Sequence, residues 1–416
     1  MRSSDESIRC PDASTLFRLP WNLGDNAMTW LEPTRQCNIT CDACFVDNEP
    51  NSHKSLEYLE SELRTLAHLR KCDALLIAGG EPLIHPQIIE IVRLVKSHKV
   101  KPVLITNGTV LDRNLAVELR KAGAYGITLH VDSHQSRPGW EGKTEKDLNE
   151  LRQHYADLLY DVGGLSCAFN TTIFPDTLAA VPDIVRWAVG YSRRVHIMTL
   201  ICVRFAGPDS RFDYYAGAKK IDLRGMPYAS CVESPNLTTA DIYREIKTIL
   251  PDLEFCAYLG GTAISHSLKW VIGTHLVCDG ISIGQLGARS MELIQNSSHF
   301  VRGRYLAYSS PSSVKRGKLS MMLALIDPHV RRALWRFLRM VAAKPSRLVK
   351  PLNIQNLSVV QPVDILENGA QDNCDGCPNK TLWDNQLVSA CRLEEYRHYG
   401  GPISSVPKPT GGFARG

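Results

Sequence analysis

The strongest constraint on the fold is an alternation, from residue 28 to residue 201, between short apolar runs and segments with helical spacing. The apolar runs are 28–33, 73–78, 102–106, 126–131, 167–173 and 195–201, and the helical segments are 55–70, 87–98, 112–122, 144–161 and 178–189. Strands separated by helices of this length form parallel sheets with crossover helices. Periodicity leaves two α/β architectures open, an open six-unit barrel and a doubly wound sheet.

The polar motifs of this half of the chain fall where the predicted strands end. The cysteine loop CNITCDAC follows the first strand, GGEP (79–82) follows the second, and Thr106-Asn107-Gly108 follows the third. In both architectures, ligands bind beyond the carboxyl ends of parallel strands. We therefore expect these motifs to form one shared site.

The cysteines favour metal binding. The chain has 13 of them, and its first residues contain acids and lack the apolar segment of a secretory signal. We therefore expect a cytoplasmic protein, in whose reducing compartment clustered cysteines hold metal more often than they form disulfides. Cys37, Cys41 and Cys44 offer three thiolates within eight residues, which suits three irons of a cubane cluster and leaves one iron open. Zinc is the alternative, and it would need a fourth ligand nearby.

The order and spacing of CNITCDAC, GGEP and TNG resemble the radical S-adenosylmethionine (SAM) superfamily over residues 28–205. The resemblance implies a partial (β/α)6 TIM-like barrel with a [4Fe-4S] cluster on Cys37, Cys41 and Cys44. It implies that the open iron binds SAM and that an electron, from a reductase or ferredoxin-type donor, cleaves the sulfonium bond. The 5′-deoxyadenosyl radical then abstracts hydrogen from the substrate.

The same resemblance implies further SAM contacts. Gly79, Gly80, Glu81 and Pro82 are expected at the methionine group, and Asn107 and Asn170 at the ribose or the carboxylate. The sequence departs from the family in two places, because Ala43 stands where an aromatic residue usually precedes the third cysteine, and His130 stands where a serine is usual. Phe45 is then the candidate for the adenine, and His130 or Asp132 for the substrate.

A second cysteine group lies near the C-terminus. Cys374 and Cys377 form a CxxC pair, Cys391 follows, and a hairpin with Asp384-Asn385 at its turn is expected between them. Such a knuckle can hold zinc or a second iron–sulfur cluster. It resembles a short relative of the SPASM or twitch auxiliary-cluster extensions of the superfamily. Cys278 is our first candidate for a fourth ligand, ahead of Cys256 and Cys231, and a position left open for substrate is the alternative.

Residues 315–350 carry the positive charge of the chain. They contain ten Lys and Arg and one acid, Asp327, whereas acidic residues outnumber basic ones by four elsewhere. After Asp327-Pro328 a helix is predicted with an apolar stripe, which is formed by Leu334, Phe337, Leu338 and Val341. A basic amphipathic helix of this kind can lie on an anionic membrane surface, and the alternative is that its apolar face packs on the core.

These observations give the predicted organisation. The parts are an N-terminal extension (1–27), the barrel core (28–205), a mixed connecting region (206–314), the basic segment (315–350) and a C-terminal auxiliary-cluster region (351–416). We expect an enzyme that activates an inert C–H bond of a hydrophobic or lipid-like substrate. The alternatives are maturation of a ribosomal peptide or a small natural product, and a non-catalytic metal-binding protein. The modest net charge of +5 does not indicate a nucleic-acid partner.

Overall fold

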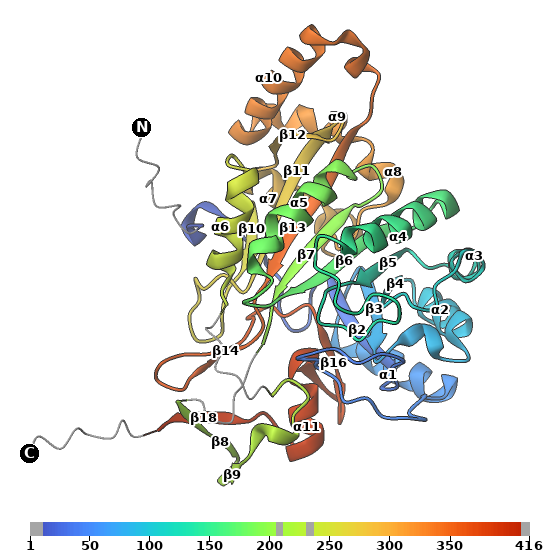
Figure 1. Cartoon of the computed structure of the whole chain (residues 1–416), viewed down its shortest axis with the longest axis vertical. Coiled ribbons are helices and arrows are strands. Elements are labelled where there is room, and N and C mark those ends of the chain that lie inside the picture. The colour runs from blue at the N-terminus through green and yellow to red at the C-terminus, as the bar shows by residue number, and fades with distance from the viewer. Residues whose placement is uncertain (1–10, 205–210, 230–236, 409–416) are drawn as a thin grey trace, which may run out of the picture.

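The structure is a computed structural model that describes residues 11–204, 211–229 and 237–408. Its centre is an open sheet of eleven strands, and the six predicted strands lie side by side in chain order, all parallel (Figure 1). They are β2 (Met28–Thr34), β3 (Ala74–Gly79), β4 (Lys101–Thr106), β5 (Gly126–His130), β6 (Ser166–Ile173) and β7 (Ile197–Cys202). The predicted mixed α/β fold is confirmed.

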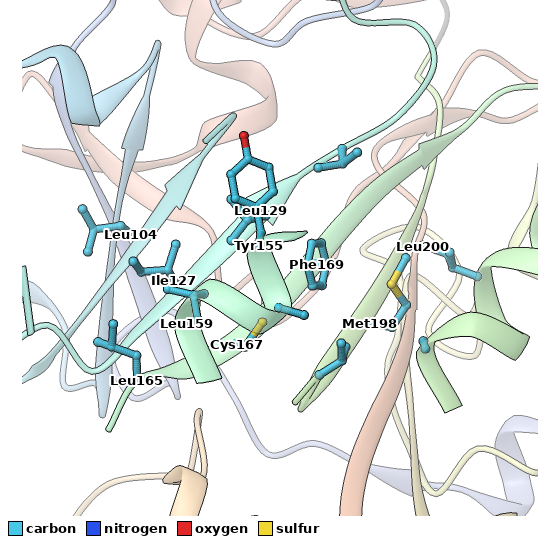
Figure 2. Packing of buried hydrophobic residues seen from close by; sticks show 14 of the residues in the cluster. Leu104, Ile127, Leu129, Tyr155, Leu159, Leu165, Cys167, Phe169, Met198 and Leu200 are labelled. Carbon is cyan, nitrogen blue, oxygen red and sulfur yellow. The ribbon is translucent and has the colours of Figure 1, made fainter. Parts of the chain in front are cut away.

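The crossover helices decide between the two predicted architectures. They are α1 (Leu56–Leu69), α2 (Ile88–Ser97), α3 (Arg113–Ala122), α4 (Leu148–Val162) and α5 (Val181–Gly190). A doubly wound sheet reverses its strand order, whereas β2 to β7 follow one another without reversal. Since crossovers are right-handed, such an order puts the helices on one face, as in part of a TIM barrel. On that face Ile127 and Leu129 pack against Tyr155 and Leu159 of α4 (Figure 2).

The sheet continues beyond the predicted core. β7 pairs in parallel with β13 (Leu352–Val360), which pairs antiparallel with β11 (Trp270–Cys278). β10 (Ala257–Leu259), β1 (Phe17–Arg18) and β12 (Ile281–Gln285) complete it, and α6 (Thr239–Ile249) and α7 (Ala288–Arg302) belong to the same region. The sheet therefore includes strands from the predicted connecting and C-terminal regions.

The inner face of the sheet, opposite the crossover helices, changes character along the strands. Nearer the amino ends of the strands, Leu76, Val103 and Ala168 pack with Leu19 and Tyr308 in an apolar cluster. Towards the carboxyl ends of the strands, the inward positions become polar. His130 Nε2 lies 3.0 Å from Thr172 Oγ1, and Asn170 is the inward residue between the two halves of β6. The inner face is therefore filled at one end and polar at the other.

The C-terminal region adds small elements below the carboxyl ends of the strands. The predicted hairpin is confirmed as β16 (Lys380–Trp383) and β17 (Gln386–Ser389), with Asp384 and Asn385 both in the left-handed region at φ of 46° and 59°. Further elements of this region are β14 (Asp364–Ile365), β15 (Gln371–Asp372), α11 (Leu393–Tyr399) and β18 (Ser404–Pro407). β18 pairs with β8 (Phe212–Ala216) of the connecting region, and β8 pairs with β9 (Lys219–Ile221).

The basic segment forms the predicted helix, but its buried face differs from the predicted stripe. The short turns η5 (Met321–Leu325) and η6 (Pro345–Leu348) pack against α10 (Pro328–Ala343). Two further turns, α8 (Pro311–Val314) and α9 (Gly317–Ser320), precede them in the chain. Val330, Ala333 and Phe337 are buried against β12, whereas Leu338 is exposed. The apolar face therefore packs on the core. In the described residues, no helix has the length and apolarity that crossing a membrane requires.

A buried ion pair holds the connection that follows β5. Arg152 of α4 and Glu145 form this pair with side-chain exposures of 0% and 1%. Arg152 also donates to the Val131 carbonyl at 2.9 Å, and Glu145 accepts from the Ser133 amide at 2.6 Å. The pair thus anchors the loop at the carboxyl end of β5 to the layer of helices.

We predict that Arg152→Met destabilises the chain by about 3–5 kcal/mol, because it leaves the Glu145 carboxylate buried without its partner. The urea midpoint of the full chain, followed by circular dichroism, measures this. Arg152→Met with Glu145→Gln should recover about half of the loss, since no charge is then buried. A single variant that unfolds at the same midpoint as the parent would contradict the assignment.

Candidate active site

The cysteine loop after β2 is held in place by hydrogen bonds to two other segments. The Cys37 amide donates to Asn48 Oδ1 at 2.9 Å, and Asn48 Nδ2 donates back to the Cys37 carbonyl at 3.0 Å. On the other side, the Ser136 amide donates to the Thr40 carbonyl and the Asp42 amide to the His134 carbonyl, at 2.8 and 2.9 Å. The loop is therefore fixed between the ends of β2 and β5.

The three thiols of this loop lie near enough to influence one another electrostatically. Cys37, Cys41 and Cys44 are each half-buried. Burial raises the pKa of all three, and the pKa of Cys41 is raised further by Cys44, Asp132 and Cys37. Thiols that repel one another as thiolates are held in that form by a cation, and soft thiolates are the ligands that iron–sulfur clusters and zinc prefer. The residues present fit such a metal group.

Two glycines of GGEP bring a second backbone against the cysteine loop. Gly79 has a φ of +125°, and a Cβ there would lie 2.5 Å from the Thr34 carbonyl oxygen. A Cβ on Gly80 would overlap the Gln36 carbonyl oxygen. The Gly80 and Glu81 amides instead donate to Thr34 and Gln36 at 2.9 and 2.8 Å. Glycine is needed here because the two backbones touch.

Glu81 joins the ends of β3 and β4. Its buried carboxylate accepts hydrogen bonds from Thr106 Oγ1 at 2.6 Å, from the Asn107 amide at 2.7 Å and from the Leu83 amide at 2.9 Å. Both oxygens are therefore engaged within the chain. The next residue, Pro82, begins a short buried turn. This leaves the backbone of the motif as the part that faces outward.

The other predicted cofactor contacts lie around the same opening. Asn107 Nδ2 is 3.8 Å from Cys37 Sγ and 2.8 Å from Asn38 Oδ1. Asn170 is the half-buried partner of His130 in the register of β5 and β6. Phe45 is half-buried beside Cys44, and Ala43, where an aromatic residue was expected, has a φ of 53°.

The structure separates the two substrate candidates. His130 is on the inner face, and 31% of its side chain is exposed, whereas 4% of the Asp132 side chain is exposed. Burial alone would raise the pKa of Asp132, but hydrogen bonds from His130 and from the Thr172 and His134 amides lower it overall. His130 is therefore the more accessible of the two, and the Asp132 carboxylate lies 3.0 Å from its Nε2.

Arg137 is a site residue that the sequence reasoning missed. It lies under the cysteine loop, 3% exposed, and its Nη2 donates to the His130 carbonyl at 3.1 Å. Burial lowers its pKa, while Tyr155 and Cys41 raise it. Within the described residues, its Nε has no hydrogen-bond partner. A buried cation beside Cys41 matches the negative charge of a thiolate-bound cluster.

The C-terminal thiols form a separate group at the same end of the sheet. Cys374 forms an isolated backbone β-bridge with Gly261, which follows β10. Gly376 packs so closely against the Trp21 carbonyl that a Cβ on Gly376 would overlap it. The Cys374–Cys377 hydrogen bond raises the pKa of Cys374 and lowers that of Cys377 to about 6. Burial raises the pKa of Cys391, and Cys377 adds to this rise. The structure thus brings these three residues together as predicted.

Two buried arginines contact this group. Arg70 donates to the Cys377 carbonyl at 2.7 Å, and Arg204 donates to the Cys391 carbonyl. Burial lowers the pKa of Arg70 to about 10. Neither arginine belongs to a recognisable motif, so the sequence carried no signal for them.

The structure does not bring Cys278 to this group. It ends β11 opposite Leu352, whereas the cysteines lie near Gly261, beyond the other end of that strand. Cys278 is buried in the apolar cluster under α10. Cys256 is also occupied elsewhere, because its thiol donates to the Ile272 carbonyl at 3.2 Å. Cys231 lies outside the described residues.

Comparison with known families agrees with this geometry. The model of the radical SAM superfamily matches residues 31–188, the stretch that contains the cysteine loop, GGEP and the strand ends. Residues 31–188 therefore carry a radical SAM superfamily domain.

Curated relatives match parts of this chain. It is 33% identical to the GTP 3',8-cyclase of Chlorobaculum tepidum over 33% of this chain and 42% of that protein. It is 29% identical to the AdoMet-dependent heme synthase of Methanosarcina barkeri over 28% and 36%. Among solved structures, Streptococcus suis SuiB bound to S-adenosylmethionine gives a TM-score of 0.39 at 15% identity, over 54% and 47%. The chain therefore spans less than half the length of these relatives.

α11 connects the two cysteine groups. It begins two residues after Cys391. His398 of α11 lies 2.6 Å from Asp47, three residues beyond Cys44, and Glu394 lies 3.2 Å from Arg35. Arg397 pairs with the buried Glu32 of β2. The helix that follows the second group is therefore held against the base of the first.

We predict that Gly80→Ala lowers the iron retained per chain at least severalfold after anaerobic reconstitution, because the new methyl group pushes the Gln36 carbonyl and with it the cysteine loop. Gly190→Ala is the matched control, since a Cβ there meets nothing within 4 Å. Iron is measured in chains that also carry Cys374→Ala and Cys377→Ala, so that the iron content reports only the site on the cysteine loop after β2. Equal iron in both variants would contradict the inferred contact.

Proposed function

We propose that this chain holds a [4Fe-4S] cluster on Cys37, Cys41 and Cys44, binds SAM at its open side, and removes hydrogen from an unactivated C–H bond of a substrate. The proposal rests on the three neighbouring thiols, fixed at the carboxyl ends of the strands directly against the backbone of Gly79 and Gly80. When bound, the cluster and SAM supply the radical chemistry. The chain's own residues supply binding, orientation and exclusion of water.

The chain's contribution to SAM binding follows from which groups remain available. Glu81 uses both of its oxygens inside the chain. The methionine group would therefore be held by the backbone of Gly79 to Pro82, and Asn107 and Asn170 offer side-chain amides at the same opening. Phe45 would pack against the adenine from the position after the third cysteine. Arg137 would balance the negative charge of the cluster from below.

A polar substrate is favoured over the lipid-like one that the basic segment suggested. That segment packs on β12 and the start of β13, at the end of the sheet opposite the cysteine loop. The inner face near the loop presents His130, Asn170 and Thr172. Hydrogen-bonding groups in a partly enclosed site select a substrate that can pair with them. We infer a peptide or a small polar natural product.

We propose a second iron–sulfur cluster on Cys374, Cys377 and Cys391, with zinc as the alternative. The buried Arg70 and Arg204 support it, because two cations at the ligand backbone suit a cluster with net negative charge. The SPASM-like or twitch-like character of this region rests on the same three thiols. In the simplest arrangement, the three thiols leave one coordination position of the cluster open, and the substrate occupies it.

Electrons must reach the first cluster from outside the chain. We propose a reductase or a ferredoxin-type protein as the donor. A purely structural role for both cysteine groups is the competing function. The glycine-lined contact and the polar inner face argue against it, since a structural metal site needs neither.

We predict that replacing Cys37, Cys41 and Cys44 together with Ala abolishes reductive cleavage of SAM and leaves metal bound at the C-terminal thiols. The readouts are 5′-deoxyadenosine formed under dithionite, and iron and zinc per chain. SAM cleavage that persists in the triple variant would overturn the assignment of these residues. Absence of cleavage in the reconstituted parent would favour the structural role.

We predict that Cys374→Ala with Cys377→Ala lowers iron per chain by about the content of one cluster while SAM cleavage persists in part. Cys278→Ala is the matched control, and it should leave the metal content unchanged because Cys278 lies in an apolar cluster. A loss of zinc instead of iron would show that the second site is a zinc site. A loss of iron in Cys278→Ala would restore that residue as a ligand.

A further inference from the structure

The surface of residues 315–350 exposes no carboxylate. Asp327 is the single acid of this segment, and it is 1% exposed. Its carboxylate accepts from the Gly287 amide at 2.8 Å and from the Ser290 hydroxyl. The carboxylate caps the N-terminus of α10 and is engaged in hydrogen bonds there. The exposed charge that this segment contributes is therefore positive throughout.

Some cations of this segment form ion pairs, and others remain available to an external partner. Arg336 pairs with Asp252 and Lys350 pairs with Asp279, and both of these acids lie outside the segment. Arg331, Arg339 and Lys344 are exposed, and none of them makes an ion pair within the part of the chain that the structure describes. These three side chains remain uncompensated on and just after α10.

Large apolar side chains stand exposed among these cations. On α10, Trp335 is 62% exposed and Leu338 is 46% exposed, and helical spacing places both on the flank between Arg331 and Arg339. The turns beside α10 expose more of them, and the full set is Leu319, Met322, Leu325, Ile326, Trp335, Leu338, Leu348 and Val349. We call these eight side chains, together with Arg331, Arg339 and Lys344, the basic apolar surface.

This surface is far from both cysteine groups. β13 begins at Leu352 beside Cys278 and runs towards Val360 and the C-terminal cysteines. α10 and the turn after it form one end of the molecule, and β14 and α11 lie towards the other (Figure 1). The length of the central sheet therefore separates the basic apolar surface from the candidate active site.

We propose that the basic apolar surface docks the protein on an anionic lipid membrane. Exposed cations are attracted to lipid phosphates, and Trp and Leu side chains insert at the level of the headgroups. The separation from the cysteines means that docking leaves the mouth of the site open to solution. Charge selects lipid over an apolar protein partner here, because an apolar interface would bury Arg331 and Arg339 without counter-charges.

The test is sedimentation of the full chain with vesicles of phosphatidylcholine alone and with phosphatidylglycerol added. The expected result is binding that requires the anionic lipid and weakens with salt. Arg331→Gln with Arg339→Gln should lower the partition coefficient by about fivefold for each cation removed. Trp335→Ser with Leu325→Ser should also lower it, since the inserted apolar area is lost.

Matched controls lie on the exposed crossover helices. Arg64→Gln with Arg93→Gln removes two exposed cations, and Tyr58→Ser removes an aromatic side chain that is 55% exposed. Neither should change partitioning. The proposal is overturned if the parent binds no vesicles, if the controls weaken binding as much as the surface variants, or if the surface instead mediates a dimer that Trp335→Ser dissociates.

Discussion

The backbone of Gly79 and Gly80 touches the backbone of the cysteine loop, and the geometry of the whole site depends on this contact. The Gly80 and Glu81 amides donate hydrogen bonds to the carbonyls of Thr34 and Gln36. The Glu81 carboxylate in turn accepts hydrogen bonds from Thr106 Oγ1 and the Asn107 amide. The ends of β2, β3 and β4 therefore behave as one unit. Three thiols on a loop would otherwise sample many arrangements, and ordering them in advance removes that cost from cofactor binding.

Buried cations form the second layer of both cysteine groups. Arg137 lies under the first group, and Arg70 and Arg204 contact the second. Burying a guanidinium is unfavourable unless an opposite charge or hydrogen bonds compensate it. Arg204 is compensated by Glu395, whereas Arg70 and Arg137 retain nitrogen atoms without partners among the described residues. Thiolate-bound clusters would supply the missing charge, which links the stability of these regions to metal loading.

The sequence predicted the parts of this structure that depend on local patterns. Each strand from β2 to β7 was identified from its apolar run, and the Asp384-Asn385 turn from its residue types. The glycines of GGEP were expected at the methionine group of SAM, and the structure adds that their backbone touches the cysteine loop. These features are set by residues close together in the chain.

The missed features depend on contacts between residues far apart in sequence. Nothing local shows that β13 inserts between β7 and β11, and so nothing local shows that Cys278 ends far from Cys374. Arg70 and Arg204 reach the second group across more than 180 residues. The stripe on α10 was shifted, because β12 contacts Val330 and Ala333 rather than Leu338. Tertiary packing, not helical propensity, chose that face.

The position of β13 has a consequence for biosynthesis. A ribosome releases the chain from its N-terminus, so β2 to β7 and the first cysteine loop emerge long before residues 352–360. Until then β7 has an unpaired edge, and β10 and β11 have no partner that attaches them to it. The first cysteine loop can thus meet iron on a half-assembled sheet, whereas the second group can form only after Cys391 has been synthesised.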